Sequence, residues 1–387
     1  MEMGKPVTES RGEVKYAAGF VEFYAEEAKR LYGTTIPSQF AHKRLHTNLK
    51  PLGVVYAVTP WNFPAAMVTR KVAPALAAGC VVILKPAEQT PLTALRLAEL
   101  WMEVGGPAGT LQVLPCADPV PVSRVLMDDP RVRKLSFTGS TEVGMLLYAQ
   151  AAKTMKRLSL ELGGHAPFII FADADVPRAV REVAASKFRN AGQTCVCANR
   201  VYVHEAVHDE FVTQLASVTS TLRVGDPLDE QTQIGPLVDA AALDKVQSHV
   251  ADAKRLGARV VTGGNGGDRT FFTPTVLTNV RADMRIMNEE TFGPVAPVIP
   301  FRSDDDAIAQ ANAVPVGLAA YVWTRDLGRA IRAAEALDYG IVGVNDGLPA
   351  TPQAPFGGVK NSGIGREGGR WGIEEFLDVQ YVSVALP

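Results

Sequence analysis

The sequence predicts an α/β protein with two domains, each built on a doubly wound parallel sheet. Three observations support this fold class. The chain has 387 residues, enough for two or three domains. Apolar residues make up 47% of it and charged residues 21%, as in globular proteins. Short apolar runs alternate with amphipathic helical patterns along almost the whole chain, and this alternation is typical of parallel sheets covered by helices.

The first series of elements ends at two adjacent glycines, 163–164, where we expect the domain boundary. An apolar face over residues 13–31 predicts an opening helix. Residues 80–84 (CVVIL) form a continuous apolar run, as expected of a strand buried on both faces. The other elements predicted in this half are strands at 53–59, 111–114, 133–137 and 158–162, and helices at 65–78, 91–104, 119–127 and 141–152.

The second series alternates in the same way, with no internal repeat and no low-complexity linker. Its turn at 263–268 (GGNGGD) needs no functional explanation. The predicted elements are strands at 168–171, 200–203, 259–261, 295–301, 320–323 and 341–344, and helices at 176–190, 206–222, 240–256, 304–313 and 327–337.

The charge balance excludes several classes of protein. Thirty-nine Lys and Arg residues against 41 Asp and Glu give a net charge of −2, so we expect neither nucleic acid nor an anionic membrane as a partner. No run approaches the roughly 18 apolar residues of a membrane span. The first twenty residues lack the apolar core of a signal peptide. Four cysteines do not make a disulfide framework, so the sequence predicts a reducing, cytoplasmic setting. We also expect no bound metal.

Cys195 is a candidate nucleophile because of its position. It lies in the segment AGQTCVC at 191–197, between a predicted helix and a predicted strand. A cysteine on a short loop between packed elements can be exposed and rigidly held, and its thiolate is the reacting form. A lone cysteine is more often an inert buried thiol, and we assign that role to Cys80 and Cys116.

Glu161 and Asn62 are the other candidates for chemistry. Glu161 interrupts the apolar run LSLEL at the end of a predicted strand. A desolvated carboxylate there has a raised pKa, which suits a general base, although an exposed edge glutamate is the alternative. Asn62 falls at the start of a predicted helix, where its amide and free backbone N–H groups can stabilise an oxyanion. A simple N-cap is the alternative.

Two loops after predicted strands suit a nucleotide. Lys85 and Glu88 follow the strand at 80–84, and ligands of parallel sheets bind at the carboxyl ends of strands. The segment FTGSTEVG at 137–144 joins a strand to a helix N-terminus, which favours phosphate. The GxGxxG string at 363–368 follows no predicted strand, and we expect no dinucleotide there.

Seven motifs occur together and in order, and together they resemble the aldehyde dehydrogenase superfamily. They are PWNFP at 60–64, KPAEQTP at 85–91, SFTGSTEVG at 136–144, LELGG at 160–164, GQTC at 192–195, EETFGP at 289–294 and PFGG at 355–358. Longer segments resemble the succinate-semialdehyde dehydrogenases more narrowly: MVTRK at 67–71, ASKFRN at 185–190, FRNAGQTCVCANR at 188–200 and PFGGVKNSGIGREG at 355–368.

This resemblance implies an aldehyde dehydrogenase-like fold with a cofactor domain, a catalytic domain and a β-arm that builds dimers or tetramers. It assigns residues 1–32 and 51–163 to the cofactor domain, 164–375 to the catalytic domain, and 33–50 and 376–387 to the arm. The family carries several dozen more residues before the segment matching Met1, so we expect the first part of the cofactor domain to be missing. An active enzyme with a shortened or misassigned start and an inactive fragment are both open.

The resemblance also implies a thioester mechanism. Cys195 would attack the aldehyde carbon. Asn62 and the backbone N–H of Cys195 would stabilise the oxyanion, and Glu161 would activate the hydrolytic water, with Lys71 nearby. The presence of Glu161 favours hydrolysis over transfer to coenzyme A.

The family's cofactor contacts can be carried over to matching positions. We expect NAD over NADP because Glu88 would repel a 2′-phosphate, although Lys85 leaves NADP open. The resemblance assigns eight residues to the adenosine ribose, the pyrophosphate and the nicotinamide half of the cofactor. They are Trp61, Lys85, Glu88, Gly139, Ser140, Gly144, Glu290 and Phe292.

The predicted substrate is a short aldehyde with a terminal carboxylate, most simply succinate semialdehyde. Arg70 lies eight residues after Asn62 on one predicted helix, and Arg189 lies six residues before Cys195. Two guanidinium groups can clamp a carboxylate. Thr351 stands where related enzymes place a serine, and the prolines beside it favour glutarate semialdehyde or another ω-carboxy aldehyde as the alternative. Cys197 is a candidate redox partner for Cys195, with a buried bystander as the alternative.

Overall fold

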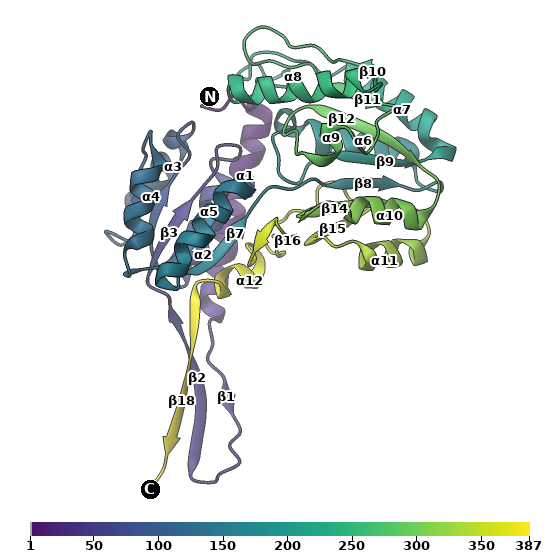
Figure 1. Ribbon diagram of the computed structural model, residues 1–387. Helices are drawn as coiled ribbons and strands as arrows, with labels where there is room; N and C mark the ends of the chain where they lie inside the picture. The colour runs from purple at the N-terminus through teal and green to yellow at the C-terminus, as the bar shows by residue number, and fades with distance from the viewer. Residues whose placement is uncertain (1) are drawn as a thin grey trace. The chain divides into compact units, whose positions relative to one another are not determined.

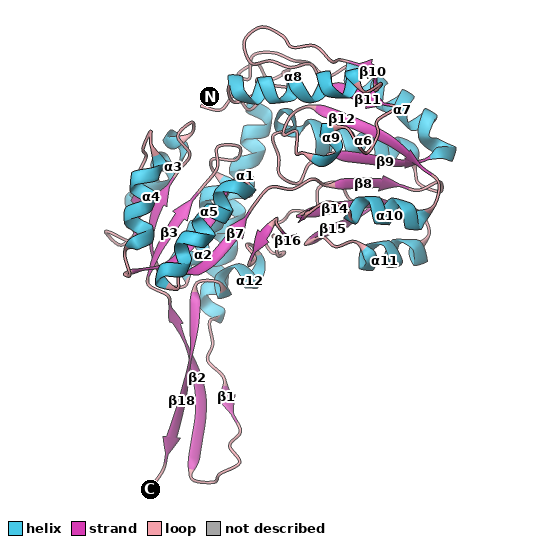
Figure 2. Ribbon diagram, in the orientation of Figure 1, coloured by secondary structure: helices cyan, strands magenta, loops and turns pink. Residues whose placement is uncertain are grey.

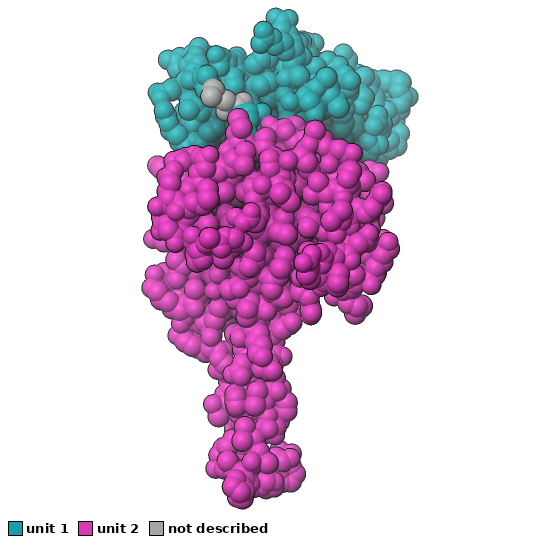
Figure 3. All heavy atoms as spheres, turned by 90° about the vertical axis from the view of Figure 1, so that its left-hand side faces the viewer, with its two compact units in different colours: residues 1–12, 161–350, 357–363 teal, residues 13–160, 351–356, 364–387 magenta. Residues whose placement is uncertain are grey.

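A computed structural model describes residues 2–387, and the polypeptide divides into two compact units. The first unit extends to Gly12 and also contains residues 161–350 and 357–363. The second contains residues 13–160, 351–356 and 364–387 (Figure 3). Each unit contains a sheet with helices packed against it, which confirms the predicted α/β class (Figure 2).

The second unit holds a six-stranded sheet in the order β17-β7-β6-β3-β4-β5. Its elements are β3 (Val54–Val58), α2 (Ala66–Ala77), β4 (Val81–Lys85), α3 (Pro91–Glu103), β5 (Leu111–Val113), α4 (Pro119–Asp128), β6 (Val132–Thr138), α5 (Thr141–Ala151), η2 (Ala152–Thr154), β7 (Arg157–Glu161), β17 (Gly363–Ile364) and α12 (Gly369–Glu374). Helix α1 (Val7–Glu27) and η1 (Ala28–Arg30) precede them.

The chain winds in both directions from β3. It passes through α2 and α3 to β4 and β5, then returns through α4 to β6 on the other side of β3. Because such parallel crossovers are right-handed, α2 and α3 cover one face of the sheet and α4 and α5 the other. Val55, Tyr56 and Ala57 of β3 are fully buried, while β4 exposes part of Val81. Ile83, on the same face of β4 as Val81, is also partly exposed, so β4 is fully buried on one face and partly on the other, whereas β3 is buried on both faces after Val54.

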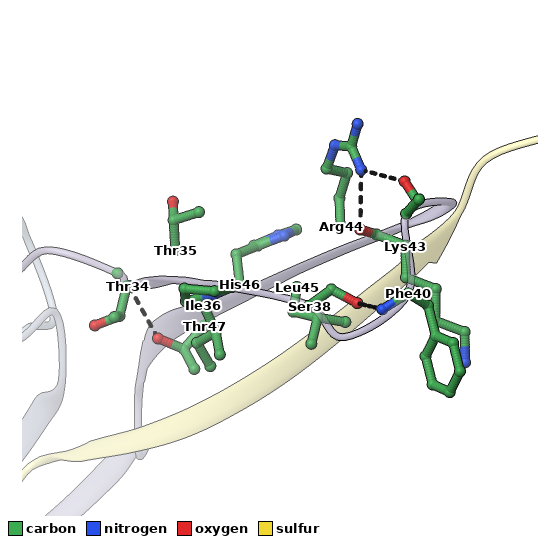
Figure 4. Close-up of a pocket in the computed structure, with 13 residues that line it drawn as sticks. Thr34, Thr35, Ile36, Ser38, Phe40, Lys43, Arg44, Leu45, His46 and Thr47 are labelled. Atoms are coloured by element: carbon green, nitrogen blue, oxygen red, sulfur yellow. Dashed lines mark hydrogen bonds between the residues drawn. The ribbon is translucent and has the colours of Figure 1, made fainter.

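A three-stranded arm extends from this unit (Figure 1). It consists of β1 (Thr35–Ile36), β2 (Lys43–Pro51) and β18 (Leu377–Ala385), in antiparallel order β1-β2-β18. A cavity of about 670 Å³ lies between the loop that enters β2 and the strand itself (Figure 4). Its rim is held by Thr47, whose Oγ1 accepts the N–H of Thr34 at 3.0 Å. None of the expected active-site residues lines this cavity.

The first unit holds a seven-stranded sheet in the order β10-β11-β12-β9-β8-β14-β15, parallel except for β10. A separate pair, β13 and β16, is antiparallel. The elements of this unit are β8 (Pro167–Ile170), α6 (Val176–Phe188), η3 (Arg189–Gly192), β9 (Arg200–His204), α7 (Glu205–Ser220), α8 (Ala240–Arg255), β10 (Arg259–Thr262), β11 (Thr275–Thr278), α9 (Arg285–Asn288), β12 (Val295–Phe301), α10 (Asp304–Asn312), β13 (Val316–Gly317), β14 (Ala319–Trp323), α11 (Leu327–Ala336), β15 (Ile341–Val344) and β16 (Val359–Lys360).

Side-chain caps explain where many of these helices begin. An aspartate or serine side chain accepts a backbone N–H of the first turn, which satisfies a donor that the helix itself cannot pair. These N-cap residues are Asp118 for α4, Asp175 for α6, Asp239 for α8, Ser303 for α10 and Asp326 for α11.

The structure differs from the expected elements in several places. Helix α1 begins at Val7, six residues before the expected start, and α6 ends at Phe188 rather than at 190. The short strands β11, β13, β16 and β17 and helix α12 were not expected. The unit boundary falls after Leu160, close to the expected glycines, but residues 364–375 cluster with the second unit. The functional labels of the domains stay predictions. None of the helices in residues 2–387 has the length and apolar character needed to cross a bilayer.

Candidate active site

Three of the sequence motifs meet in the first unit. LELGG leads into β8, GQTC leads into β9 and EETFGP leads into β12, and these three strands are parallel neighbours in the order β12-β9-β8. The amino ends of neighbouring parallel strands lie at one edge of a sheet. The fold therefore gathers Glu161, Cys195 and Glu290 toward the same edge.

Two glycines show how closely these segments pack. A Cβ on Gly164 would lie 2.8 Å from the carbonyl oxygen of Cys195. A Cβ on Gly192 would lie 2.1 Å from the carbonyl oxygen of Gly293, and Gly192 has a φ of +75°. Both distances are too short for a side chain, so the LELGG and EETFGP segments approach the GQTC segment only through glycine.

The backbone before Cys195 is unusual. Asn190 and Ala191 have φ values of +52° and +54°, in the left-handed region that residues with a Cβ rarely adopt. Their conformation ends α6 earlier than the periodicity predicts. The N–H of Cys197 then donates to the carbonyl of Thr194 at 3.2 Å, which closes a turn with Cys195 at its second position. Cys195 is half-buried.

Hydrogen bonds from several elements hold this turn. The Gln193 side chain donates to the carbonyl of Asn190 at 3.1 Å and accepts the N–H of Val238 at 2.9 Å. Tyr321 of β14 donates its hydroxyl to the carbonyl of Val196 at 2.5 Å. The turn is therefore fixed on both sides of Cys195, as a rigidly held nucleophile requires.

Glu161 and Arg189 also belong to this unit. Glu161 is the last residue of β7, whose other residues belong to the second unit, and it is 2% exposed, so the structure places the carboxylate in the interior, as the sequence pattern predicted. Arg189 directly follows α6 and is half-buried. The alternative of Glu161 as an exposed edge residue is excluded.

The EETFGP segment is held by α8. His249 of α8 contacts the residues on either side of Glu290. Its Nδ1 lies 3.1 Å from Thr291 Oγ1, and its Nε2 lies 3.2 Å from Glu289 Oε2. Between them, Glu290 has its carboxyl group enclosed, and burial raises its pKa to about 7. Phe292 has a φ of +53°. The segment thus presents a carboxyl group that is easily protonated near neutral pH.

Cys197 is 1% exposed. Its Sγ lies 3.5 Å from the carbonyl oxygen of Gly192, 3.6 Å from Asn199 Oδ1 and 3.6 Å from Lys187 Nζ. Burial raises the pKa of its thiol, with Lys187 acting in the opposite direction. A redox role for Cys197 stays a prediction.

The second unit carries the remaining candidates at the carboxyl ends of its strands. The sheet changes winding direction between β3 and β6, and ligands of doubly wound sheets bind at such a switch point. The loop after β3 contains Trp61 and Asn62, and the loop after β6 contains Gly139 and Ser140. Lys85 ends β4, the other neighbour of β3. The fold thus brings these loops to one sheet edge.

The role expected for the start of α2 needs a correction. The helix begins at Ala66, four residues after Asn62, so Asn62 and Arg70 do not lie on one helix as expected. The N–H groups of Ala65 and Ala66 donate to Glu13 Oε1 at 2.7 and 3.2 Å. Those donors are therefore occupied by Glu13 of α1, and the oxyanion role rests on the buried side chain of Asn62.

Several expected cofactor residues have contacts within their own unit. Glu88 Oε1 accepts from Lys85 Nζ at 2.6 Å, and Lys85 also donates to the carbonyl of Pro86. Ser140 caps α5 by accepting the N–H of Val143. A Cβ on Gly139 would lie 2.5 Å from the ring of Phe137. Gly144 is buried in the first turns of α5.

Glu367 is a functional candidate that sequence reasoning missed. It lies inside the glycine-rich string at 363–368, where the sequence predicts no dinucleotide site. Its Oε2 lies 2.6 Å from Arg70 Nε, and its Oε1 accepts from Lys71 Nζ. The guanidinium of Arg70 also stacks on Phe356, 4.1 Å from the ring centre. All three charged side chains are buried. Arg70 is thus a buried, ion-paired residue, and its role as a substrate clamp stays a prediction.

Replacing Glu367 with Gln is expected to destabilise the protein by about 3 kcal/mol, because it leaves two buried cations without a counter-charge. Burial raises the pKa of Glu367, but Lys71 and Arg70 outweigh it, so the pKa is lowered below its usual 4.5. The carboxylate therefore contributes stability above pH 4.5, and the contribution is lost as the pH falls through the lowered value.

Chemical denaturation of the parent and the E367Q variant at neutral and acidic pH tests this expectation. Glu205→Gln is the matched control, since Glu205 pairs with Arg302 at 2.8 Å in an exposed position. Equal losses for the two variants at neutral pH would contradict the assigned importance of the buried cluster.

Thr351 lies on the loop before β16 and is half-buried. Its hydroxyl donates to Gln353 Oε1 at 2.5 Å. Thr351 already donates its hydroxyl proton to Gln353, so this proton is not available to a substrate carboxylate. Thr351 is therefore a weaker candidate for substrate binding than the sequence suggested.

Comparisons with known proteins agree with this arrangement. The family model described as "Aldehyde dehydrogenase family" matches residues 1–382. The chain is 54% identical to a succinate-semialdehyde dehydrogenase [NADP(+)] of Escherichia coli and 51% identical to a glutarate-semialdehyde dehydrogenase of Pseudomonas putida. Each match covers 100% of this chain and 80% of the relative. A crystal structure of an E. coli NADP-dependent enzyme superposes with a TM-score of 0.98 at 54% identity, with the same coverage of both chains. The chain belongs to the aldehyde dehydrogenase family.

Proposed function

We propose that this protein oxidises a short aldehyde with a terminal carboxylate, converting succinate semialdehyde to succinate with NAD or NADP as the hydride acceptor. The observation that carries the proposal is the convergence of the Glu161, Cys195 and Glu290 segments at three neighbouring strand ends. Relatives named as succinate- and glutarate-semialdehyde dehydrogenases, each at least half identical, support the substrate class.

The chain's own residues divide the chemistry as follows. The thiolate of Cys195 attacks the aldehyde carbon, and the backbone N–H of Cys195 and the amide of Asn62 donate to the oxyanion. Departure of a hydride leaves a thioester on Cys195. Glu161 then takes a proton from water, which attacks the thioester and releases the acid and the thiolate. Lys71, which is paired with Glu367, is the residue proposed to assist this proton transfer.

The nicotinamide cofactor supplies the hydride acceptor when it is bound. The residues present fit such a group. Glu290 Oε1 is buried without a hydrogen-bond partner among residues 2–387, so a ribose hydroxyl would satisfy it. Trp61, Lys85, Glu88, Gly139, Ser140 and Gly144 lie in or beside the loops at the carboxyl ends of β3, β4 and β6 and would hold the adenosine half. Phe292, next to Glu290, would contact the nicotinamide ring.

The cofactor preference is expected to favour NAD. Glu88 can accept hydrogen bonds from a ribose diol, whereas a 2′-phosphate would meet its negative charge. The contact with Lys85 at 2.6 Å weakens this repulsion, so we expect a difference in kcat/KM of about tenfold rather than exclusion. Steady-state kinetics with both cofactors check this, and Glu88→Ala should narrow the difference. A parent that uses both equally would contradict the role of Glu88.

Arg189 is expected to set the preference for an acidic substrate. Losing a charged hydrogen bond costs about 1.5–3 kcal/mol, so Arg189→Ala should lower kcat/KM for succinate semialdehyde by tenfold or more. Uncharged butanal, which has no carboxylate, should be affected far less. Measuring both aldehydes in the parent, R189A and R70A separates a substrate contact from general damage. If butanal is the better substrate of the parent, the proposed substrate class is wrong.

Glutarate semialdehyde is the second candidate substrate. Two features around Thr351 favour this longer acid: the hydrogen bond from Thr351 to Gln353 and the prolines at 349 and 352. Both change the local structure at the position where a serine would hold the carboxylate of a shorter acid. The same kinetic panel with graded chain length decides between the two. Absence of turnover with every aldehyde would contradict the proposed function.

We also propose a homodimer or homotetramer built through the β1-β2-β18 arm, in a cytoplasmic setting. The outer edge of β18 exposes Val379 and Tyr381. An exposed strand edge with apolar side chains suits pairing with a second copy. Light scattering of the parent and an arm variant such as Tyr381→Lys tests this assembly.

A further inference from the structure

Lys187 is a buried cation that the proposed mechanism does not use. It lies in the last turn of α6 with no exposed surface. Its Nζ donates to Asn199 Oδ1 at 2.9 Å and approaches Cys197 Sγ at 3.6 Å. A lysine in the last turn can serve the helix dipole alone. Here, however, the side chain leaves its own helix and reaches the segment that follows Cys195.

Both acceptors of Lys187 are uncharged. Burying an ammonium group is costly unless a counter-charge or strong hydrogen bonds offset it. Among the other buried lysines, Lys71, Lys85 and Lys134 contact the carboxylates of Glu367, Glu88 and Glu375, whereas Lys156, like Lys187, donates to uncharged acceptors, here two backbone carbonyls. Because neither acceptor neutralises the positive charge of Lys187, this charge can stabilise a nearby group that becomes negative.

The turn that carries Cys195 is connected to this charge through Cys197. Cys197, which Lys187 contacts, closes the turn from Thr194, and its Sγ reaches the carbonyl of Gly192 at 3.5 Å. Residues across such a turn are less than about 7 Å apart, so with the length of the Cys197 side chain and its 3.6 Å contact the ammonium group lies within roughly 13 Å of the Cα atom of residue 195. The two side chains that Lys187 contacts, Cys197 and Asn199, are both buried.

Other titratable groups surround the turn. Burial raises the pKa of Tyr321 and lowers that of His165, which keeps both neutral near pH 7. Glu290 opposes a thiolate whenever it is ionised, and Arg189 is half-buried. The titratable groups that interact electrostatically with Cys195, Cys197 or Lys187 are Arg189 from η3, Tyr321 from β14, Glu290 before β12 and His165 before β8. Glu161 ends β7 in the segment that leads into β8.

We propose that Lys187 is a positioning residue whose buried ammonium group, in contact with Cys197 of the Thr194–Cys197 turn, stabilises the thiolate form of Cys195. The inference rests on the proposed role of Cys195 as nucleophile. A unit charge about 13 Å away at an effective dielectric constant of about 20 changes a pKa by about one unit. Removing the charge should therefore raise the pKa of the Cys195 thiol by about that much.

The test is the pH dependence of Cys195 alkylation by iodoacetamide, followed residue by residue with peptide mass spectrometry. Lys187→Met removes the charge at nearly constant volume. Asn199→Asp keeps the lysine and the shape but places a carboxylate against it. Both variants should shift the alkylation profile of Cys195 upward by about one pH unit. Lys134→Met, a buried lysine of the second unit, is the matched control and should leave the profile in place.

Using two variants protects the test against misfolding of either one, and circular dichroism confirms which variants are folded. An unchanged profile in the folded variants would overturn the role of Lys187. A failure of the proposed function would give a different result. If Cys195 were not the nucleophile, the fully alkylated parent would still oxidise aldehyde.

Discussion

Replacing Cys195 with Ser is expected to reduce aldehyde oxidation by at least about 10³-fold, because a serine hydroxyl remains protonated where a thiolate would form. The turn that holds residue 195 depends on backbone contacts and on Gln193 and Tyr321, none of which needs the sulfur atom. The variant should therefore fold normally and retain cofactor binding.

Steady-state kinetics and a fluorescence titration with NAD measure the two halves of this expectation. Cys116→Ser is a suitable control, since Cys116 is a half-buried thiol in the other unit. Substantial turnover by C195S would remove Cys195 from the mechanism. Loss of cofactor binding together with activity would indicate structural damage instead.

Replacing Glu161 with Gln is expected to separate the two chemical steps. Gln keeps the size of the buried side chain but cannot take a proton from water, so hydrolysis of the thioester should slow by about 10²–10⁴-fold. Acylation and hydride transfer do not need this base. The first turnover should therefore remain fast and appear as a burst of reduced cofactor, followed by a very slow steady rate.

Stopped-flow absorbance at enzyme concentrations comparable to substrate checks the burst. Its amplitude should approach one equivalent per active site. A variant that loses the burst as well would place Glu161 in the acylation step, and one with normal steady turnover would show that another group activates water.

The sequence predicted the parts of this structure that depend on local pattern. Alternating apolar runs located the main strands, and left-handed residues such as Asn190 explain why α6 stops short of its periodicity. The motifs around Cys195 and Glu161 lie in one unit, and the close packing at Gly164 and Gly192 gives a physical reason for their glycines.

The contacts that escaped prediction join residues far apart in the chain. Glu13 binds the start of α2 from 52 residues away, and Glu367 meets Lys71 across 296 residues. No local spacing encodes such pairs. The glycine-rich string around Glu367 follows no predicted strand, and its spacing gives no indication of what its one acidic residue contacts. Two-residue strands such as β13 and β16 carry too few side chains for a periodic signal.

Cys195 is expected to form an acyl intermediate during oxidation of an ω-carboxy aldehyde. Peptide mass spectrometry of the E161Q variant, quenched during turnover with succinate semialdehyde and NAD, tests it most directly. We expect the mass of a succinyl thioester on the peptide containing Cys195, and no adduct when the cofactor is omitted. Two results would contradict covalent catalysis by Cys195. One is turnover by the parent with no acyl group on Cys195 in the slowed E161Q variant, and the other is an acyl group on Cys197 instead.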